Sequence, residues 1–401
     1  MLNFLNYIIF KIKIYSFLIE MDSLDLISLN TKRISIKNKN KESKNYTKCI
    51  IISLIFLFIS NLFTIFFIFI LYKKICSMNN PKGKIKIDNI SNINKNKVNN
   101  SYNNNNYLIE EYIKRQNNYC NYPDKFYSQE FEEIIKLTNF SFRNISYQMY
   151  VYKYLDNYMS NEILNTGQYE PYHMSHFLDM LKYYAEKNNI LKNEDIFMID
   201  IGGNMGAYPS FLGRFGYSII TFEASPRNSY IIYKNYCSIN RYSNIIIVNK
   251  GLSNEEKTCN YYSQVDGIGN GAVLCDKNDE RIRMGDINLK KTFEANLIKL
   301  SNFMPYFSNK NVALIKLDIE GGEGKVIEDA IDLINKYHVP FVFSEFNPGL
   351  LVSHGTDPKK YLELFAKNGY KISYEGFLNV SYVSPEEVNS VSNLYFVYDG
   401  K

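Results

Sequence analysis

The chain has 401 residues, of which 46% are hydrophobic and 22% charged, with a formal net charge of +5. This length accommodates one enzyme domain with additional segments. The excess lysine lies mainly in the first hundred residues, beside an apolar run, so the charge does not indicate a nucleic-acid partner. The six cysteines show neither a disulfide framework nor metal-ligand spacing, and we expect no metal site. Three of them are expected to be small buried hydrophobic residues: Cys237, Cys259 and Cys275.

Residues 1–48 form a basic N-terminal segment, and an apolar run follows. Residues 49–72, CIIISLIFLFISNLFTIFFIFILY, contain no charge over 24 positions. A helix of this length can cross a hydrocarbon core of about 30 Å, so the sequence predicts one transmembrane helix. The run is too long and too far from the N-terminus for a cleaved signal peptide.

Basic residues flank both ends of this run but lie somewhat closer to it on the N-terminal side, which favours a cytosolic N-terminus and a luminal C-terminal part. Five Asn-x-Ser/Thr sequons are compatible with that orientation: Asn89, Asn99, Asn139, Asn144 and Asn379. Residues 73–106 are rich in Asn and Lys and poor in bulky apolar residues, as expected of a low-complexity stem. We therefore expect a single-pass membrane protein of the secretory pathway, in the ER or Golgi.

Apolar runs alternate with helical stretches in the remaining segment, residues 107–401. The predicted buried strands are residues 196–201, 218–223, 244–249, 312–318 and 340–346. The predicted helices are residues 207–215, 229–240, 324–337 and 359–368, and two apolar runs, 370–374 and 393–399, end the chain. This order predicts an α/β, Rossmann-like, doubly wound sheet that is mostly parallel and ends in an antiparallel hairpin. Residues 251–311 form a long insertion, expected to edge the site or carry small strands of its own.

The segment IDIGGNMG, residues 199–206, joins the first strand to a helix. Asp200 ends the strand, and glycines then let the backbone approach a ligand at the carboxyl edge of the sheet: Gly202, Gly203 and Gly206. Amides at the start of the helix can bind a carboxylate or phosphate. The spacing of a dinucleotide fingerprint is not met, because Asn204 and Ala207 stand where it has glycines. This counts against NAD without excluding it.

Glu223 ends the second strand, about twenty residues after the glycine turn. At that position an acidic side chain typically accepts hydrogen bonds from the hydroxyls of an adenosine ribose. The alternative is that Glu223 caps the helix that begins after Pro226.

The segment LIKLDIEGGEGKVIEDA, residues 314–330, places four charged residues at the end of the fourth strand: Lys316, Asp318, Glu320 and Glu323. A buried strand seldom needs so many charges. A carboxylate desolvated beside a substrate hydroxyl could accept its proton, and Asp318, Glu320 and, at the end of the fifth strand, Glu345 are the candidates. Alternatively, Asp318 and Glu320 cap the next helix. The four histidines could also act as bases, but a packing role is favoured for each: His173, His176, His338 and His354.

Together these motifs resemble the FkbM family of S-adenosylmethionine-dependent methyltransferases. DIGGNMG, FEASP and IKLDIEGGE correspond to the family's DIGANIG-like turn, FEP-like strand end and IKxDxEGxE segment, over about residues 169–374. The resemblance implies a class I fold and O-methylation, usually of a sugar, glycolipid or other natural product. It also implies that the methionine part of the cofactor lies among Asp200, Gly202, Asn204 and Gly206, with Glu223 at the ribose and Glu170 nearby. The chain departs from the family at Ser301, where Asp is frequent, and at Ala224, where proline is usual.

We therefore expect a membrane-anchored O-methyltransferase that uses S-adenosylmethionine and acts on a hydroxyl of a glycan, glycolipid or related small molecule. Its expected partners are this acceptor and the membrane, without nucleic acid. One alternative is an NAD- or nucleotide-sugar-dependent enzyme on a Rossmann fold. The other is a catalytically inactive, membrane-anchored binding protein.

Overall fold

A computed structural model describes residues 100–122, 129–154, 156, 158–239, 244–264, 267–275 and 289–400. The predicted N-terminal segment, transmembrane helix and residues 73–99 of the predicted stem lie outside these described residues. Within the described ranges, no helix combines the length and the apolar character needed to cross a membrane.

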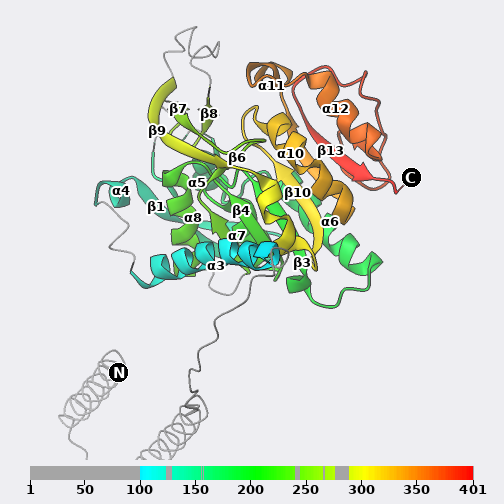
Figure 1. Ribbon diagram of the computed structural model, residues 1–401. Coiled ribbons are helices and arrows are strands. Elements are labelled where there is room, and N and C mark those ends of the chain that lie inside the picture. Colours follow the sequence, from blue (N-terminus) through cyan, green and yellow to red (C-terminus); the bar gives the residue numbers. More distant parts are fainter. Residues whose placement is uncertain are drawn as a thin grey trace, which may run out of the picture. The chain divides into compact units, whose positions relative to one another are not determined.

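A seven-stranded sheet forms the centre of the described chain, with strand order β12-β13-β11-β10-β3-β4-β5 (Figure 1). Its strands are β3 (Ile196–Ile201), β4 (Ser218–Phe222), β5 (Ile245–Val248), β10 (Asn311–Leu317), β11 (Phe341–Phe346), β12 (Tyr370–Ser373) and β13 (Ser392–Tyr398). Only β13 runs against its neighbours, since it pairs antiparallel with both β11 and β12. The predicted mostly parallel α/β sheet with a C-terminal antiparallel hairpin is thus confirmed.

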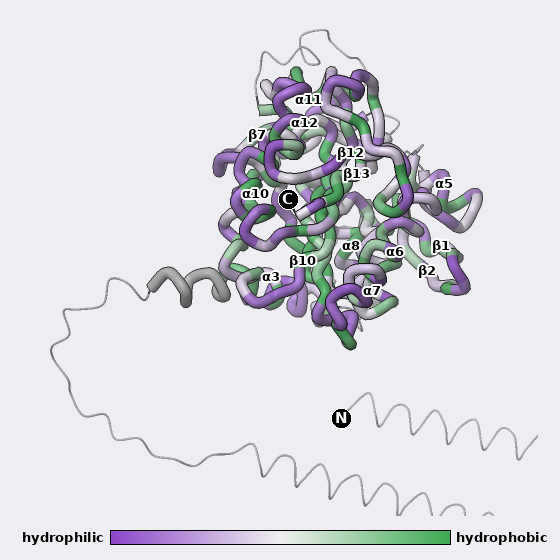
Figure 2. Tube along the Cα trace, turned by 90° about the vertical axis from the view of Figure 1, so that its right-hand side faces the viewer, coloured by the Kyte–Doolittle hydropathy of each residue, from purple (hydrophilic) through white to green (hydrophobic). Residues whose placement is uncertain are grey.

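Continuous apolar sequence forms the central strands because side chains on both faces are covered. Every residue of β3 is buried, and successive side chains enter different hydrophobic clusters, as with Met198 on one face and Ile199 on the other. Hydrophobic residues, green in Figure 2, accordingly gather along interior strands such as β10 and β13. The two layers that cover the sheet fix the positions of its carboxyl ends.

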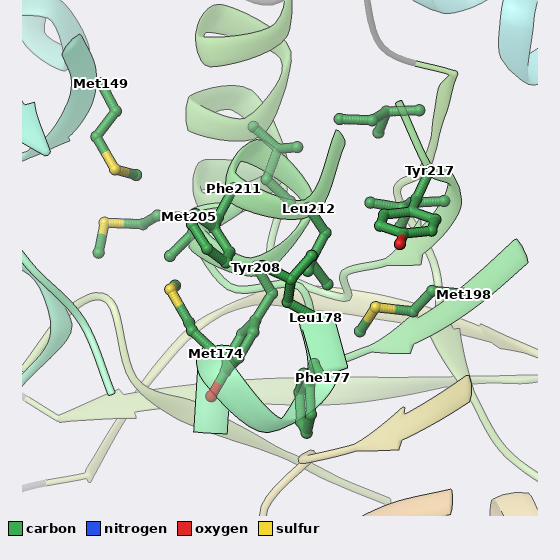
Figure 3. Packing of buried hydrophobic residues seen from close by; sticks show 14 of the residues in the cluster. Met149, Met174, Phe177, Leu178, Met198, Met205, Tyr208, Phe211, Leu212 and Tyr217 are labelled. Atoms are coloured by element: carbon green, nitrogen blue, oxygen red, sulfur yellow. The ribbon is translucent and has the colours of Figure 1, made fainter. Parts of the chain in front are cut away.

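The layer that contains Met198 is built by α5 (Met159–Thr166), α6 (Pro171–Lys187), α7 (Ala207–Gly213), α8 (Pro226–Ile239) and the hairpin of β1 (Ile135–Phe142) and β2 (Ile145–Tyr152). Figure 3 shows Met174, Phe177 and Leu178 of α6 packing beside Tyr208 and Phe211 of α7. The opposite layer is built by α3 (Asn100–Asn121), η4 (Leu300–Phe307), α10 (Glu323–Tyr337) and α12 (Pro358–Lys367). Short elements complete the described chain: α4 (Gln129–Glu133), η3 (Asn193–Asp195) and α11 (Pro348–Ser353).

The insertion carries its own four-stranded sheet, of order β6-β9-β7-β8. This confirms the expectation that the insertion carries small strands of its own. Its strands are β6 (Gly251–Leu252), β7 (Lys257–Gln264), β8 (Gly271–Leu274) and β9 (Leu289–Ile298). β7 pairs antiparallel with both β8 and β9, and β6 pairs parallel with β9. Because β6 follows β5 after only two residues, this small sheet begins at the carboxyl edge of the large one.

Helix α3 covers the free edge of β5. The carboxamide of Gln116 donates to the Ile245 carbonyl at 2.9 Å and accepts the Ile247 N–H at 3.2 Å. One side chain thus satisfies two backbone groups of the edge strand that another strand could otherwise bind. The helix begins at Asn100, within the segment predicted as stem.

Two disulfides contradict the expectation that Cys237, Cys259 and Cys275 are unpaired hydrophobic residues. Cys120 of α3 is bonded to Cys237 of α8, and Cys259 of β7 is bonded to Cys275, just after β8. The first pair is 117 residues apart in sequence, so its proximity depends on tertiary packing that spacing alone does not reveal.

Candidate active site

A cavity of about 770 Å³ lies at the carboxyl edge of the large sheet. Its walls are the turn after β3, the ends of β4 and β10, the start of the insertion and the β7–β8 loop. Small-molecule sites commonly have volumes in this range, and open α/β sheets bind ligands at this edge. The cavity therefore lies where the sequence motifs predicted a ligand.

Six residues predicted from sequence line this cavity: Gly202, Gly203, Asn204, Glu223, Asp318 and Glu320. Four others stand behind or beside its described wall: Glu170, Asp200, Gly206 and Glu345.

Asp200 is completely buried beneath the glycine turn. Its carboxylate accepts the Thr221 hydroxyl at 2.8 Å and lies 3.5 Å from the ammonium of Lys316, which donates to the Gly202 carbonyl at 3.0 Å. The expectation that Asp200 surrounds the cofactor therefore needs refinement, because Asp200 fixes the turn from below.

The turn requires glycine at two positions. Gly202 has φ +86°, and a Cβ there would lie 1.9 Å from the Asp318 carbonyl oxygen, so any side chain would push β10 away. Gly206 has φ +83° and begins α7 against Ile232, outside the cavity wall. The turn thus brings the carboxyl ends of β3 and β10 into backbone contact.

Asn204 and Glu223 form a polar pair on the cavity wall. The Asn204 N–H donates to one carboxylate oxygen of Glu223 at 2.7 Å, and the Ser225 N–H donates to the other at 2.7 Å. Burial raises the pKa of Glu223 to about 7, although these two N–H donors favour the charged form. The Asn204 Oδ1 atom is buried and has no hydrogen-bond partner among the described residues.

This pair fits a ligand with neighbouring hydroxyl groups. Each oxygen of Glu223 accepts one backbone donor and retains further acceptor capacity. The Asn204 Oδ1 atom supplies a further acceptor, which has no partner among the described residues. Glu223 fixes the turn before α8 by accepting the Ser225 N–H, but the side chain that caps the helix is Ser225, whose hydroxyl accepts the Asn228 N–H at 3.2 Å. The alternative that Glu223 caps this helix is therefore wrong.

Glu170 lies behind the wall, at the beginning of α6, with a left-handed φ of +38°. It accepts a hydrogen bond from the hydroxyl of Tyr208, and its neighbour Tyr169 lines the cavity instead. Burial raises the pKa of Glu170, the Tyr208 hydroxyl opposes this, and Asp318 raises it further. Glu170 is therefore coupled electrostatically to the acidic end of the site without facing the cavity.

Lys316 is the central cation of this end. Its side chain is 2% exposed, and its ammonium lies 3.3 Å from Asp318 and 3.5 Å from Asp200. Burial disfavours the charge, but Asp318, Asp200 and Glu170 outweigh that effect and raise the Lys316 pKa. The side chain of Asp318 is 36% exposed, so Lys316 holds it in place while it faces the cavity.

The loop after β10 presents Asp318 and Glu320 instead of using them as caps. Helix α10 has Gly322 at its N-cap position and no side-chain cap, so the capping alternative is wrong. Glu320 has φ +59° and Gly321 φ +105°, which turns the chain sharply. The carboxylate of Glu323, 1% exposed, accepts the Ile319 N–H at 2.8 Å and closes this turn.

Glu345 lies at the end of β11, partly buried and outside the described cavity wall. Burial raises its pKa to about 8, and the charges of Asp318 and Glu320 add to the shift. Near neutral pH, Glu345 therefore keeps its proton.

The histidines mainly serve packing, as favoured from the sequence. His173 and His176 contact the same Tyr395 hydroxyl at 2.7 and 3.1 Å, and burial lowers the pKa of His173 to about 4. His354 lines the cavity, where its ring nitrogens lie 3.0 Å from the Leu350 carbonyl and 3.1 Å from that of Val273.

The sequence profile of the FkbM methyltransferase domain matches residues 200–372. This part of the chain belongs to the FkbM methyltransferase family. The match begins at Asp200 and includes the glycine turn, Glu223 and the segment after β10. The chain is accordingly an enzyme of a family of S-adenosylmethionine-dependent methyltransferases. No curated protein is significantly similar to it in sequence.

Solved structures similar to the chain include three methyltransferases. The bifunctional kinase-methyltransferase WbdD is 11% identical, with TM-score 0.29 over 57% of this chain and 39% of that one. The 16S rRNA N2 G1207 methyltransferase RsmC of T. thermophilus is 11% identical, with TM-score 0.29 over 66% and 51%. Magnesium protoporphyrin IX methyltransferase of Synechocystis PCC 6803, solved with bound SAH, is 11% identical, with TM-score 0.28 over 57% and 83%. The chain thus spans well under two thirds of the length of WbdD, and similarity this low transfers no acceptor or partner.

The two departures from the FkbM pattern have different positions. Ala224 lines the cavity. Ser301 lies at the start of η4, where its N–H and hydroxyl each donate to Asp329 at 2.8 Å, away from the described cavity wall. Ser301 is therefore bound to α10 through Asp329, and this departure lies outside the described cavity wall.

Proposed function

We propose that the FkbM domain binds S-adenosylmethionine along the carboxyl edge of its sheet and methylates a hydroxyl of a glycan, glycolipid or related molecule. The observation that carries this proposal is the continuity of one cavity between Glu223, which suits a ribose, and Asp318, which suits an acceptor hydroxyl. When bound, the cofactor supplies a methyl group activated by a sulfonium.

The cofactor end would use Glu223 and the unfilled Asn204 oxygen for ribose hydroxyls, and the backbone of the glycine turn for the methionine part. Both elements are rigid, because Glu223 is fixed by two backbone N–H groups and the turn by Lys316. Preorganised donors and acceptors of this kind align reactants at little entropic cost.

Asp318 is the residue we assign as proton acceptor. Of the three candidate carboxyl groups, Asp318 and Glu320 line the cavity, and Asp318 is held 3.3 Å from the Lys316 ammonium. Glu345 lies outside the cavity wall, and burial raises its pKa to about 8. Environments that separate two carboxyl groups in this way commonly assign them different roles. The Asp318 carboxylate would accept the proton of the acceptor hydroxyl, and Glu345 would remain neutral beside it.

The two disulfides support a location for this domain in an oxidising compartment, such as the lumen of the secretory pathway. The proposed transmembrane helix at residues 49–72 would anchor the enzyme there, where glycans and glycolipids are available acceptors. Protease protection in sealed microsomes tests this luminal location. Digestion of the FkbM domain without detergent would contradict the luminal placement.

Isothermal titration of the full chain with S-adenosylmethionine, S-adenosylhomocysteine and NAD tests the cofactor. Binding of the first two and not of NAD is expected. Binding of NAD alone would favour the oxidoreductase alternative, and binding of none would favour the inactive binding protein. Mass spectrometry of glycans and lipids from cells with and without the gene should then reveal an acceptor that differs by one methyl group.

A further inference from the structure

A second glycine-rich segment, GIGNG at residues 267–271, lies outside the motifs used so far. It forms the end of the β7–β8 hairpin of the insertion, and Gly269, Asn270 and Gly271 line the same cavity as the first glycine turn. Two glycine-rich segments that are far apart in sequence therefore face one cavity from two different sheets.

The second segment is held in place by a buried relay. The Tyr152 hydroxyl donates to the Asn228 carboxamide oxygen at 2.7 Å, and the Asn228 amide nitrogen donates to the Gly269 carbonyl at 2.9 Å. Asn228 is 1% exposed and Tyr152 is completely buried, so this relay links the loop to α8 and β2 through the protein interior. Because Tyr152 belongs to β2 and Asn228 to α8, these two elements determine where the relay meets the loop.

Glycine is required at this anchor point. A Cβ on Gly269 would lie 2.9 Å from the carboxylate of Asp156, which is itself held by the N–H groups of Tyr158 and Ser160 at 3.2 and 2.9 Å. A Cβ on Gly271 would lie 2.4 Å from the Tyr262 carbonyl oxygen. The loop is therefore packed closely on its outer side, which leaves Asn270 between two constrained glycines.

Asn270 meets the first glycine turn across the cavity. The Asn204 amide nitrogen lies 3.4 Å from the Asn270 carboxamide oxygen, which is a long hydrogen bond, and the buried Asn204 Oδ1 has no partner among the described residues. The backbone N–H of Asn204 is bonded to Glu223. Asn270, Asn204 and Glu223 thus follow one another along the proposed ribose end.

We propose that Asn270 is a cofactor-positioning residue, which binds the ribose side of the adenosine together with Asn204 and Glu223. The GIGNG loop then forms the wall of the cofactor site opposite the sheet edge. The hydrogen bonds of Tyr152 and Asn228 fix the position of this loop relative to α8. This inference rests on the proposed use of S-adenosylmethionine. It adds a binding residue from the insertion, which neither the glycine turn nor the segment after β10 contains.

Titration of Asn270→Ala in the full chain with S-adenosylmethionine, S-adenosylhomocysteine and adenosine tests the inference. We expect about 5- to 20-fold weaker binding of all three ligands, because the lost contacts involve the shared adenosine. The melting temperature without ligand should stay within about 1 °C of the parent value, since the Asn204–Asn270 bond is long. The matched control is Asn296→Ala on β9, an exposed asparagine of the same small sheet outside the cavity wall, which should bind as the parent does.

A second variant, Tyr152→Phe, removes only the hydroxyl that orients Asn228. It should weaken the same three ligands by about 2- to 5-fold, through the displaced loop. Parent-like affinity of Asn270→Ala would overturn this inference, and so would a loss confined to the ligands that carry the methionine part. Failure of the unchanged protein to bind S-adenosylmethionine would instead overturn the proposed function on which it rests.

Discussion

The two ends of the cavity are built on different physical principles. At the Glu223 end, the carboxylate is held by the backbone N–H groups of Asn204 and Ser225. At the Asp318 end, the Lys316 ammonium lies 3.3 Å from Asp318 and 3.5 Å from Asp200, and these carboxyl groups together with Glu170 raise its pKa. The first end is thus defined by backbone geometry and the second by charge. Substitutions should therefore affect cofactor affinity at the first end and proton transfer at the second.

Asp318→Asn should produce the largest effect. Loss of the assigned proton acceptor is expected to reduce methyl transfer about 10²- to 10⁴-fold while the affinity for S-adenosylmethionine stays close to the parent value. Transfer of radiolabelled methyl groups into glycan and lipid extracts measures the first quantity, and titration the second. If the affinity alone falls, Asp318 belongs to the cofactor end and the comparison fails.

Glu223→Gln should have the next largest effect. It replaces one acceptor oxygen by an amide donor that faces the Asn204 or Ser225 N–H, so we expect about 10- to 100-fold weaker cofactor binding. Titration with S-adenosylmethionine checks this. Unchanged binding would show that the ribose lies elsewhere in the cavity.

Glu345→Gln should have a moderate effect that depends on pH. In the folded protein Glu345 ionises near pH 8 instead of 4.5, so from pH 4.5 to 8 the unfolded chain loses a proton that the folded chain retains. The free energy of unfolding of the parent therefore falls across this window, and the glutamine variant lacks that loss. We expect it to be more stable by about 1 to 3 kcal/mol at pH 8 and nearly equal to the parent at pH 4.5. Denaturant unfolding at both values tests the sign, and equal stability at both would show that Glu345 ionises normally.

Ser301→Asp, which restores the residue frequent in the family, should have the smallest effect on the site. The introduced carboxylate would then lie against that of Asp329, whose side chain is 3% exposed. We expect the free energy of unfolding to fall by about 1 to 2 kcal/mol. Cofactor affinity should not change, because Ser301 lies away from both ends of the cavity. Thermal unfolding and titration together measure the two, and a change in affinity would extend the site to η4.

The sequence predicted the large sheet well because its strands are continuous apolar runs and its carboxyl edge carries charged residues that a core would not hold. It also placed Glu223, Asp318 and Glu320 at one edge. It did not reveal that Asp200 is buried beneath the turn, since the distance from Asp200 to Lys316 depends on strand register. The ionisation of Glu345 likewise depends on distances that no motif contains.

Other features were missed for local reasons. The β1–β2 hairpin turns at Arg143 and Asn144, which both have positive φ. Asn144 suits such a turn, but the Asn-Gly or Asp-Gly pair that signals it in a sequence is absent. The GIGNG loop did have a signal, namely three glycines at alternate positions, but only the fold shows that they face the first turn. The disulfides needed α3 against α8 and β7 against β8 before their cysteines could be paired.

The contact of Gln116 with β5 has a consequence for self-association. An uncovered edge strand of apolar sequence is a template for pairing with a second molecule, and β5 reads IIIV. The carboxamide of Gln116 occupies the Ile245 carbonyl and the Ile247 N–H, and the disulfide at Cys120 secures the helix that carries it. We expect reduction of that bond, or removal of the chain up to residue 116, to leave β5 open to pairing with a second molecule. Helix α3 therefore protects the enzyme against aggregation from the side of the sheet farthest from β12.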